Sequence, residues 1–238
     1  MLNSPYFVLP GPEGFKGHLL DHFLAAGYYR MQHTVFTTHH TRMHTGGAEL
    51  PVFWLRTQVN DITESSTAVA NRKKCARFTV TYHPAAITDE TEALYSQYLD
   101  AIDFNTAATC FDCLHDEWLE NPFDTRMIEI RDGNLLVAAG YFDVGHQAIS
   151  GILNFYHPAY KKYSLGKYLI LKKIDWARAN DIPLYYTGYI STAITKFDYK
   201  LFPAKTAIEV YLPAHQHWMP YHLLEKEWLQ DYHRKHFV

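Results

Sequence analysis

The chain has 238 residues, a formal net charge of −3 and 47% hydrophobic residues, which suits a globular protein of one large domain or two small ones. Its 18 Tyr and 14 Phe and its ordinary charge content exclude a disordered chain, and its mild acidity argues against broad, non-specific nucleic-acid binding. The first residues show no basic-then-apolar leader, and no apolar run approaches a membrane span. We therefore expect a cytoplasmic protein that does not enter a membrane and whose three cysteines are reduced thiols.

The first hundred residues predict a small α+β region. An amphipathic helix is expected over residues 15–26, closed by Gly27. Strands are expected over residues 28–38 and 51–59, with a polar turn between them. The sequence Thr88-Asp-Glu-Thr-Glu then predicts the capped start of a further helix, because acids in a first turn suit the helix dipole.

Two groups of metal-binding residue types occur in this part of the chain and just after it. His39, His40 and His44 lie in a Thr- and Gly-rich turn, and no Cys or carboxylate stands at a zinc-site spacing from them. We expect a solvated or hydrogen-bonding loop there, with metal binding as the minor alternative. Cys110 and Cys113 form a lone C-x-x-C motif without a second pair or a thioredoxin-like context, so they predict a packed helix end.

The middle of the chain predicts three antiparallel strands. A β-hairpin is expected over residues 127–144, since Asp132-Gly133 is a strong turn signal between two apolar runs. The third strand is expected over residues 148–156 and ends at His157-Pro158, because proline does not continue a central strand.

A basic turn and a helix follow the third strand. Between Lys161 and Arg178 the sequence has five Lys and one Arg against one acid, and the helix is expected to run to about residue 180. Gly166 lets a backbone approach a ligand, and the free N–H groups of the first helical turn favour an anion, with Ser164 as the expected cap. A phosphate-rich ligand and a merely solvated amphipathic helix both fit this pattern. Residues 184–190 then predict a buried strand, and a charged helix is expected from Pro220.

A second basic patch lies at residues 71–77, with four cationic residues in seven. If both basic patches share one face, they suit an RNA backbone. Cys75 within this patch is interpreted as an ordinary thiol, and a thiol with a lowered pKa is the alternative.

Three linked motifs carry a resemblance to a known family. They are Tyr-Ser-Leu-Gly-Lys-Tyr-Leu-Ile-Leu at 163–171, Leu-Tyr-Tyr-Thr-Gly-Tyr at 184–189, and Lys-Phe-Asp-Tyr-Lys with Phe-Pro at 196–203. In this order and spacing they resemble the C-terminal half of the arginyl-tRNA–protein transferases, a family that includes the bacterial aspartate/glutamate leucyltransferases. Phe197 stands where the family usually has Met, a volume-tolerant exchange.

The resemblance implies a fold and a domain organisation. The expected class is α+β, with the mixed sheet and flanking helices of GCN5-related N-acyltransferases and a smaller N-terminal α+β region. We expect an N-terminal aminoacyltransferase region over residues 1–105 and an acyltransferase-like domain over residues 106–238. Family members often carry N-terminal cysteines that in some hold an iron–sulfur cluster or another metal. This chain has His, Thr and Gly there instead, so no metal and no cofactor are expected.

The resemblance also implies an activity: transfer of leucine or arginine from aminoacyl-tRNA, the co-substrate, to the N-terminal α-amine of a protein with N-terminal Asp or Glu, as a degradation tag. An activated ester needs little beyond positioning, so direct attack by the amine requires no enzyme nucleophile. The residues assigned from the motifs are Asp198 and Tyr199 for proton transfer or amine positioning; Arg30, Tyr186, Gly188, Tyr189, Lys196 and Lys200 for substrate binding; and Lys161, Lys162, Ser164, Leu165, Gly166 and Lys167 for tRNA.

Two other function classes stay open at this point. One is an acetyl-coenzyme A-dependent small-molecule N-acetyltransferase, although such enzymes usually have a turn richer in glycine. The other is a non-catalytic relative that binds N-terminal degradation signals or tRNA. Coenzyme A binding would favour the first alternative, and stable tRNA binding without transfer would favour the second.

Overall fold

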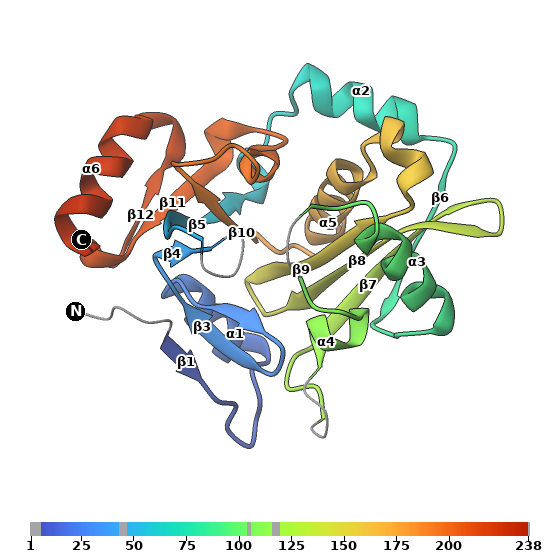
Figure 1. Ribbon diagram of the computed structural model, residues 1–238, viewed down its shortest axis with the longest axis horizontal. Helices are drawn as coiled ribbons and strands as arrows, with labels where there is room; N and C mark the ends of the chain where they lie inside the picture. Colours follow the sequence, from blue (N-terminus) through green and yellow to red (C-terminus); the bar gives the residue numbers. More distant parts are fainter. Residues whose placement is uncertain (1–5, 43–46, 104–105, 116–119, 238) are drawn as a thin grey trace.

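The computed structural model describes residues 6–42, 47–103, 106–115 and 120–237. At its centre is a large mixed sheet in the order β12-β11-β5-β10-β9-β8-β7-β6, with β4 paired to β5 (Figure 1). Its strands are β4 His40–Thr41, β5 Leu50–Gln58, β6 Thr79–Pro84, β7 Thr125–Asp132, β8 Leu135–Val144, β9 Ala148–Tyr156, β10 Leu184–Ser191, β11 Ile208–Leu212 and β12 His217–Pro220. In this described sheet β9 and β10 run parallel, and the other neighbouring pairs are antiparallel.

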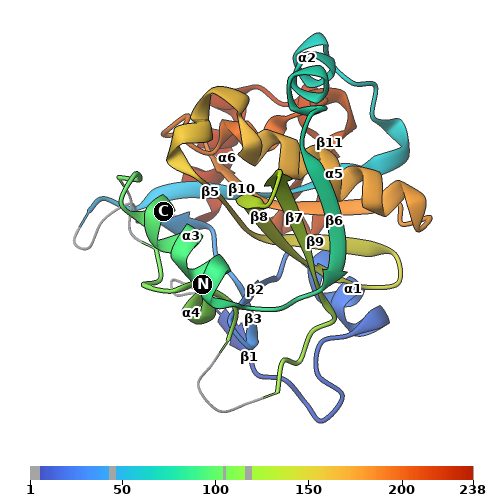
Figure 2. The ribbon, with the colours of Figure 1, turned by 90° about the vertical axis from the view of Figure 1, so that its right-hand side faces the viewer.

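Helices cover both faces of the sheet, as Figure 2 shows. One face carries α2 Ser66–Cys75, α5 Leu165–Ala179 and α6 Lys226–Phe237. The other face carries α1 Gly17–Ala25, α3 Asp89–Leu99, α4 Cys110–Leu114 and a small sheet of β1 Tyr6–Val8, β3 Thr34–Thr37 and β2 Tyr29–Met31.

The strands at the centre of the sheet are buried on both faces. Phe53 and Leu55 of β5 pack in the cluster that contains α6, whereas Trp54 between them packs in the cluster that contains α1. In β10, Tyr185 faces the α5 side and Tyr186 the α1 side. This two-sided burial explains why both segments read as continuous runs of β-forming residues.

Most predicted elements are confirmed, and with them the α+β class with a mixed sheet and flanking helices. The expected third strand coincides with β9, the Asp132-Gly133 turn joins β7 to β8, and α5 and β10 follow the basic turn. Thr88 caps α3 through a capping box, as the acids of its first turn suggested.

Three details differ from the prediction. The strand expected over residues 28–38 is two strands, β2 and β3, because Gln32 adopts a left-handed conformation with φ 51° and reverses the chain. Ser164 does not cap α5 with its side chain. A helix was expected from Pro220, but Pro220 ends β12 and α6 begins at Lys226.

The predicted division at residue 105 stays a prediction, and the large sheet takes strands from both sides of it. Strand β5 lies between β10 and β11, and β6 pairs with β7. Within the described residues, no helix combines the length and the apolar character needed to span a bilayer.

Candidate functional site

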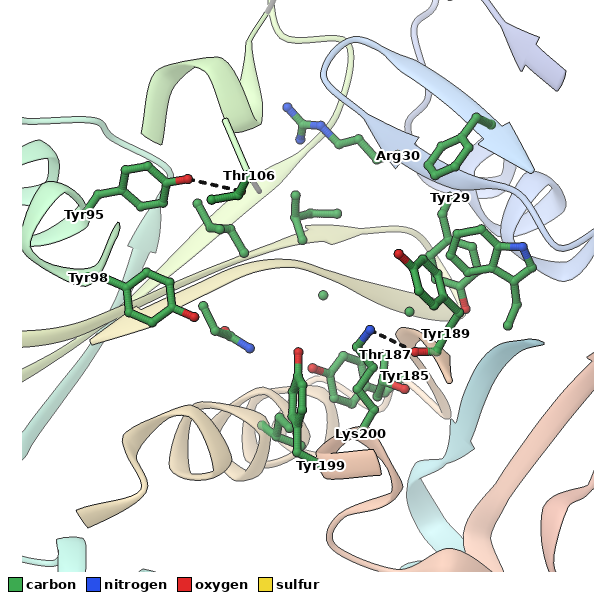
Figure 3. Close-up of a pocket in the computed structure, with 18 residues that line it drawn as sticks. Tyr29, Arg30, Tyr95, Tyr98, Thr106, Tyr185, Thr187, Tyr189, Tyr199 and Lys200 are labelled. Carbon is green, nitrogen blue, oxygen red and sulfur yellow. Dashed lines mark hydrogen bonds between the residues drawn. The ribbon is translucent and has the colours of Figure 1, made fainter. Parts of the chain in front are cut away.

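The central feature of the site is a point where two neighbouring strands part. Strands β9 and β10 pair in parallel only from Leu184↔Ala148 to Tyr186↔Ser150. Beyond this point β9 continues along β8 and β10 continues along β5, so the two strands separate. The space between them is a cavity of about 280 Å³, which we call the wedge cavity (Figure 3).

A β-bulge in β10 shapes one wall of the wedge cavity. The register of β10 against β5 shifts between Tyr186 and Gly188, and Gly188 has a φ of +99°. A Cβ atom at Gly188 would lie 3.2 Å from Nζ of Lys200. Glycine is therefore required here both for the backbone conformation and for the space that the lysine occupies.

The wedge cavity is lined mainly by aromatic and neutral polar side chains. Its lining residues are Tyr29, Arg30, Phe36, Trp54, Tyr95, Tyr98, Thr106, Gly151, Ile152, Leu153, Asn154, Ile170, Tyr185, Thr187, Gly188, Tyr189, Tyr199 and Lys200. Oγ1 of Thr187 is buried and has no hydrogen-bond partner in the described part of the chain. A buried hydroxyl without a partner is available to a ligand.

The basic turn reaches α5 through a single left-handed residue. A 3₁₀ helix over Pro158–Tyr163 ends at Ser164, whose φ and ψ are 54° and 49°. The side chain of Leu165 is buried in the core, which anchors the first turn of α5. Gly166 has no positive φ, and a Cβ there would meet only ordinary contacts with Tyr156 at 3.7 Å and beyond. Nothing within the described chain requires this glycine, so its small size favours close approach of a ligand.

Beside this turn lies a second cavity of about 580 Å³, which we call the turn cavity. It is lined by Tyr98, Asn154, Tyr156, Lys161, Ser164, Gly166, Lys167, Lys196, Phe197, Tyr199 and Lys200. Four residues, Tyr98, Asn154, Tyr199 and Lys200, line both cavities, so the two adjoin at these side chains. A group held in the turn cavity can therefore react with a group held in the wedge cavity.

Asn154 is held at this junction by a fully buried lysine. Nζ of Lys173 donates to Oδ1 of Asn154 and to the carbonyl oxygen of Tyr141, both at 2.8 Å. Because the amide oxygen takes this bond, Nδ2 of Asn154 is the free end, and it has no partner among the described residues. Gly140 faces Asn154 on β8, where a Cβ would lie 2.7 Å from Oδ1. The site thus offers a fixed N–H donor at the junction.

The predicted catalytic and substrate residues after β10 fall into two groups. Tyr199 and Lys200 line both cavities, and Lys196 lines the turn cavity while forming an ion pair with Asp103. Desolvation and the nearby rings of Tyr98 and Tyr189 raise the pKa of Tyr199, so its hydroxyl stays protonated at neutral pH. Asp198 is exposed and lines neither cavity, so its predicted role in proton transfer lacks structural support.

Two further predicted substrate residues are held in structural contacts. Arg30 donates to Asp143 at 2.7 Å, to Thr125 at 2.9 Å and to main-chain oxygens, and Figure 3 shows its guanidinium directed away from Lys200. These contacts favour a structural role over the predicted contact with an acidic substrate. Tyr186 is buried on the α1 side of the sheet and does not line the wedge cavity; its neighbour Tyr185 does. The prediction chose the wrong one of two adjacent tyrosines for the cavity wall.

The two basic patches lie side by side, as their use by one ligand requires. Asn71 of α2 donates to the carbonyl oxygen of Tyr163 at 2.9 Å, and Lys74 donates to that of Lys162. The exposed cations along this surface are Lys73, Lys74, Arg77, Lys161 and Lys162. Burial raises the pKa of Cys75 to about 11, so the alternative of an activated thiol is wrong and the ordinary thiol is confirmed.

The cysteine and histidine motifs outside the cavities have packing contacts. Cys110 and Cys113 are free thiols in α4, packed with the α3 and β8 core, and burial raises the pKa of both. His39 stacks on Phe237 with ring centroids 4.1 Å apart, and His40 lies 3.6 Å from a carboxylate. His44 lies outside the described residues. Among the described residues, no three His, Cys, Asp or Glu side chains are grouped to hold a metal ion.

The family model of the arginine-tRNA-protein transferase C terminus matches residues 90–205. This segment, just under half of the chain, is therefore similar to the C terminus of that family. The matched segment supplies every residue of the turn cavity and all four residues shared by the two cavities. The small sheet and β5, which precede the matched segment, add the far wall of the wedge cavity, including Tyr29 and Trp54.

Curated relatives of this chain carry the name of a transferase of the same kind. The aspartate/glutamate leucyltransferase of Paracoccus denitrificans is 31% identical over 172 residues, which are 66% of this chain and 60% of that protein. The protein of the same name from Jannaschia sp. is 35% identical over 123 residues, 49% of this chain and 43% of that protein. The alignments thus span about half of the length of these relatives.

A solved structure with some likeness is the C-terminal domain of a protein from Agrobacterium fabrum described as a lysylphosphatidylglycerol synthetase. The TM-score is 0.48 at 13% identity, and the alignment covers 74% of this chain and 52% of that chain. A likeness of this size carries no argument about the function of this chain.

Several residues of the site were not predicted. Asn154, Tyr98, Tyr185 and Thr187 line one or both cavities, yet none belongs to the assigned set. Asn154 carried a usable signal, because it is a lone amide inside an otherwise apolar β-strand run. The others gave none, since tyrosine and threonine are ordinary strand and core residues.

Proposed function

We propose that the protein is an aminoacyl-tRNA–protein transferase that moves an uncharged amino acid, such as leucine, to the N-terminal α-amine of an acceptor protein. The observation that carries the proposal is the pair of adjoining cavities inside a segment of the transferase family. One cavity lies beside a basic turn and the other between parting strands. A donor ester and an attacking amine need such a shared point of contact.

The turn cavity suits the 3′ end of the charged tRNA. Lys161 and Lys167 line it together with the first turn of α5, whose free N–H groups and dipole favour phosphate oxygens. The exposed lysines of α2 and of the turn continue this positive surface outward. Phosphate contacts of this kind supply most of the affinity for a nucleic-acid backbone without reading its sequence.

The lining of the cavities favours an uncharged transferred side chain. Neither cavity has an Asp or Glu among its described lining residues, and their charged side chains are Lys and Arg. A guanidinium buried there would lack a counter-ion, which is costly in a desolvated site. Leucine meets no such penalty. The relatives named above are leucyltransferases of aspartate and glutamate, so we include N-terminal Asp or Glu as the acceptor, in the cytoplasm where charged tRNA is found.

The junction residues give each part of the reaction a chemical role. The acceptor amine attacks the ester carbonyl, and Nδ2 of Asn154 donates to the oxyanion that forms. The protonated hydroxyl of Tyr199 donates to the ribose oxygen as it leaves. The activated ester and the fixed geometry make an enzyme nucleophile unnecessary.

The test is transfer of labelled leucine or arginine from charged tRNA to peptides that begin with Asp or Glu. We expect labelling from leucyl-tRNA that is lost with an N-acetylated peptide, and little labelling from arginyl-tRNA. Labelling by arginine at an equal rate would contradict the argument from the cavity lining. Absence of transfer from either donor, together with a rise in melting temperature on adding coenzyme A, would replace the proposal by an acetyltransferase.

A further inference from the structure

The amine of Lys200 sits at the junction of the two cavities inside a cage of aromatic rings. It lies 4.6 Å from the ring centroid of Tyr189, 4.8 Å from that of Phe197 and 5.7 Å from that of Tyr199. Within the described part of the chain, its one hydrogen bond goes to the carbonyl oxygen of Tyr189, at 2.9 Å (Figure 3). Among the described residues no carboxylate forms an ion pair with it.

This surrounding suits a neutral amine better than an ammonium. An ammonium has three N–H donors, and the cage provides one oxygen acceptor. Desolvation by burial lowers the pKa of Lys200 to about 7. A substantial fraction of the enzyme therefore carries the neutral amine, with a free lone pair, at neutral pH.

The titratable groups that line the cavities around Lys200 do not oppose this lowering of its pKa, because they are tyrosines, lysines or an arginine. Arg30 on β2 is ion-paired with Asp143, and the remaining groups are lysines or phenols. The titratable side chains that line the two cavities with Lys200 are Tyr29, Arg30, Tyr95, Tyr98, Tyr156, Lys161, Lys167, Tyr185, Tyr189, Lys196 and Tyr199. None of them is an anion at pH 7, so none of them stabilises a positive charge on Lys200 by ion pairing.

We propose that Lys200 is the catalytic base that accepts a proton from the α-ammonium of the acceptor protein. The assignment rests on the proposed transferase function. The ammonium gives one proton to Nζ of Lys200, and the neutral α-nitrogen then attacks the ester carbonyl carbon. As the C–N bond forms and the C–O bond breaks, the nitrogen loses a second proton and the ribose oxygen gains one. Lys200 then releases its proton to water.

This role differs from the substrate-binding contact that the sequence suggested for Lys200. An anion-binding lysine is best kept charged and accessible, whereas this amine is enclosed by rings and half-buried. A base needs the opposite properties, namely a neutral form near the working pH and a position within reach of the proton it removes. The lysines of the turn, which are exposed, remain the candidates for phosphate.

The experiment replaces Lys200 in three ways and follows leucyl transfer against pH. Lys200→Arg keeps the size and charge but cannot be neutral, and we expect kcat to fall by about 10²-fold or more at every pH. Lys200→Cys is then aminoethylated to γ-thialysine, whose amine is more acidic than that of lysine. We expect this enzyme to regain activity, with the alkaline-rising limb of its profile moved to lower pH. The amine of the peptide titrates alike in all assays, so a moved limb belongs to residue 200.

Controls and a measurement without turnover separate this assignment from the proposed function. Lys205→Arg, at an exposed lysine outside both cavities, should leave the rate and the profile unchanged. Lysine ¹³C-methylation followed by NMR should show a signal that titrates near pH 7 and is absent from Lys200→Arg.

Two results would overturn the role of Lys200 and leave the transferase function intact. One is a wild-type rate of leucyl transfer in Lys200→Arg, and the other is an unchanged rising limb in the pH profile of the thialysine enzyme. If the Lys200 signal titrates near pH 7 as expected but the wild-type protein shows no transfer, the transferase function is overturned, and this role with it.

Discussion

Asn154→Asp is the sharpest test of the junction between the cavities. Asp has nearly the shape of Asn, and its carboxylate still accepts the hydrogen bond from Lys173. The exchange removes one group, the Nδ2 donor that faces the cavities, and puts an acceptor in its place. The buried contact beneath the site is therefore kept while the predicted oxyanion donor is lost.

The expected loss of activity and of stability follows from the separate contacts of Oδ1 and Nδ2 of Asn154. Loss of a single oxyanion donor lowers kcat by roughly 10²–10³, about 3–4 kcal/mol in the barrier, and repulsion by the carboxylate favours the upper end. Stability should change little, because Lys173 gains an anionic partner. Asn154→Ala loses both ends, so it should lower the activity and also cost about 1–3 kcal/mol of unfolding free energy through the stranded amine.

The assay is kcat for leucyl transfer under saturating charged tRNA, with urea unfolding of each variant in parallel. Asn134→Asp, in the β7–β8 turn, is the matched control and should behave as the wild type. Asn154→Asp activity within threefold of the wild type, in folded protein, would refute the assignment of Nδ2 as the oxyanion donor.

Three further outcomes follow from the structure. Gly188→Ala should lower the free energy of unfolding by about 1–2 kcal/mol because of its φ of +99°, and it should also reduce transfer by displacing Lys200. Gly133→Ala, with φ +62° and open space around it, should lower the stability alone. Urea unfolding and kcat, measured together, distinguish the two outcomes. Lys74→Glu should weaken tRNA binding and lower the slope of log Kd against log salt by roughly one or more, with kcat unchanged at saturation. Burial lowers the pKa of Lys173 to about 7, so between about pH 7 and 10 the unfolded chain binds more protons and wild-type stability rises with pH. Lys200 contributes to the same rise, so Lys173→Met should reduce it in urea titrations, and an unchanged slope would contradict the lowered pKa of Lys173.

The order of elements was predictable because each carries its own local signal. The Asp-Gly turn, the proline after β9 and the threonine cap of α3 act within a few residues of themselves. The motifs also singled out Gly166, Tyr199 and Lys200, and all three line the turn cavity.

The remaining parts of the site depend on contacts between distant segments. Tyr185 and Tyr186 lie in a strand buried on both faces, so composition alone does not tell which of them faces the cavity. The orientation of Asn154 depends on Lys173 in the following helix, and the structural contact of Arg30 depends on Asp143, which lies far along the chain. Asp198 shares a motif with Lys200, but the short 3₁₀ helix turns it toward solvent.

The position of β5 has a consequence for how the chain folds. Gln58 at one end of this strand pairs with Leu184, and Arg56 pairs with Glu209. The middle of the sheet therefore forms by pairing between segments that lie far apart in the sequence. When the ribosome has made β5, its long-range partners β10 and β11 are still to come, and only the short strand β4 can pair with one end of it. Such non-local pairing is slow, and it leaves most of this apolar strand unpaired while synthesis continues. We expect folding to be late and cooperative, and the segment over residues 90–205, made alone, to lack the strand that covers β10 and to aggregate.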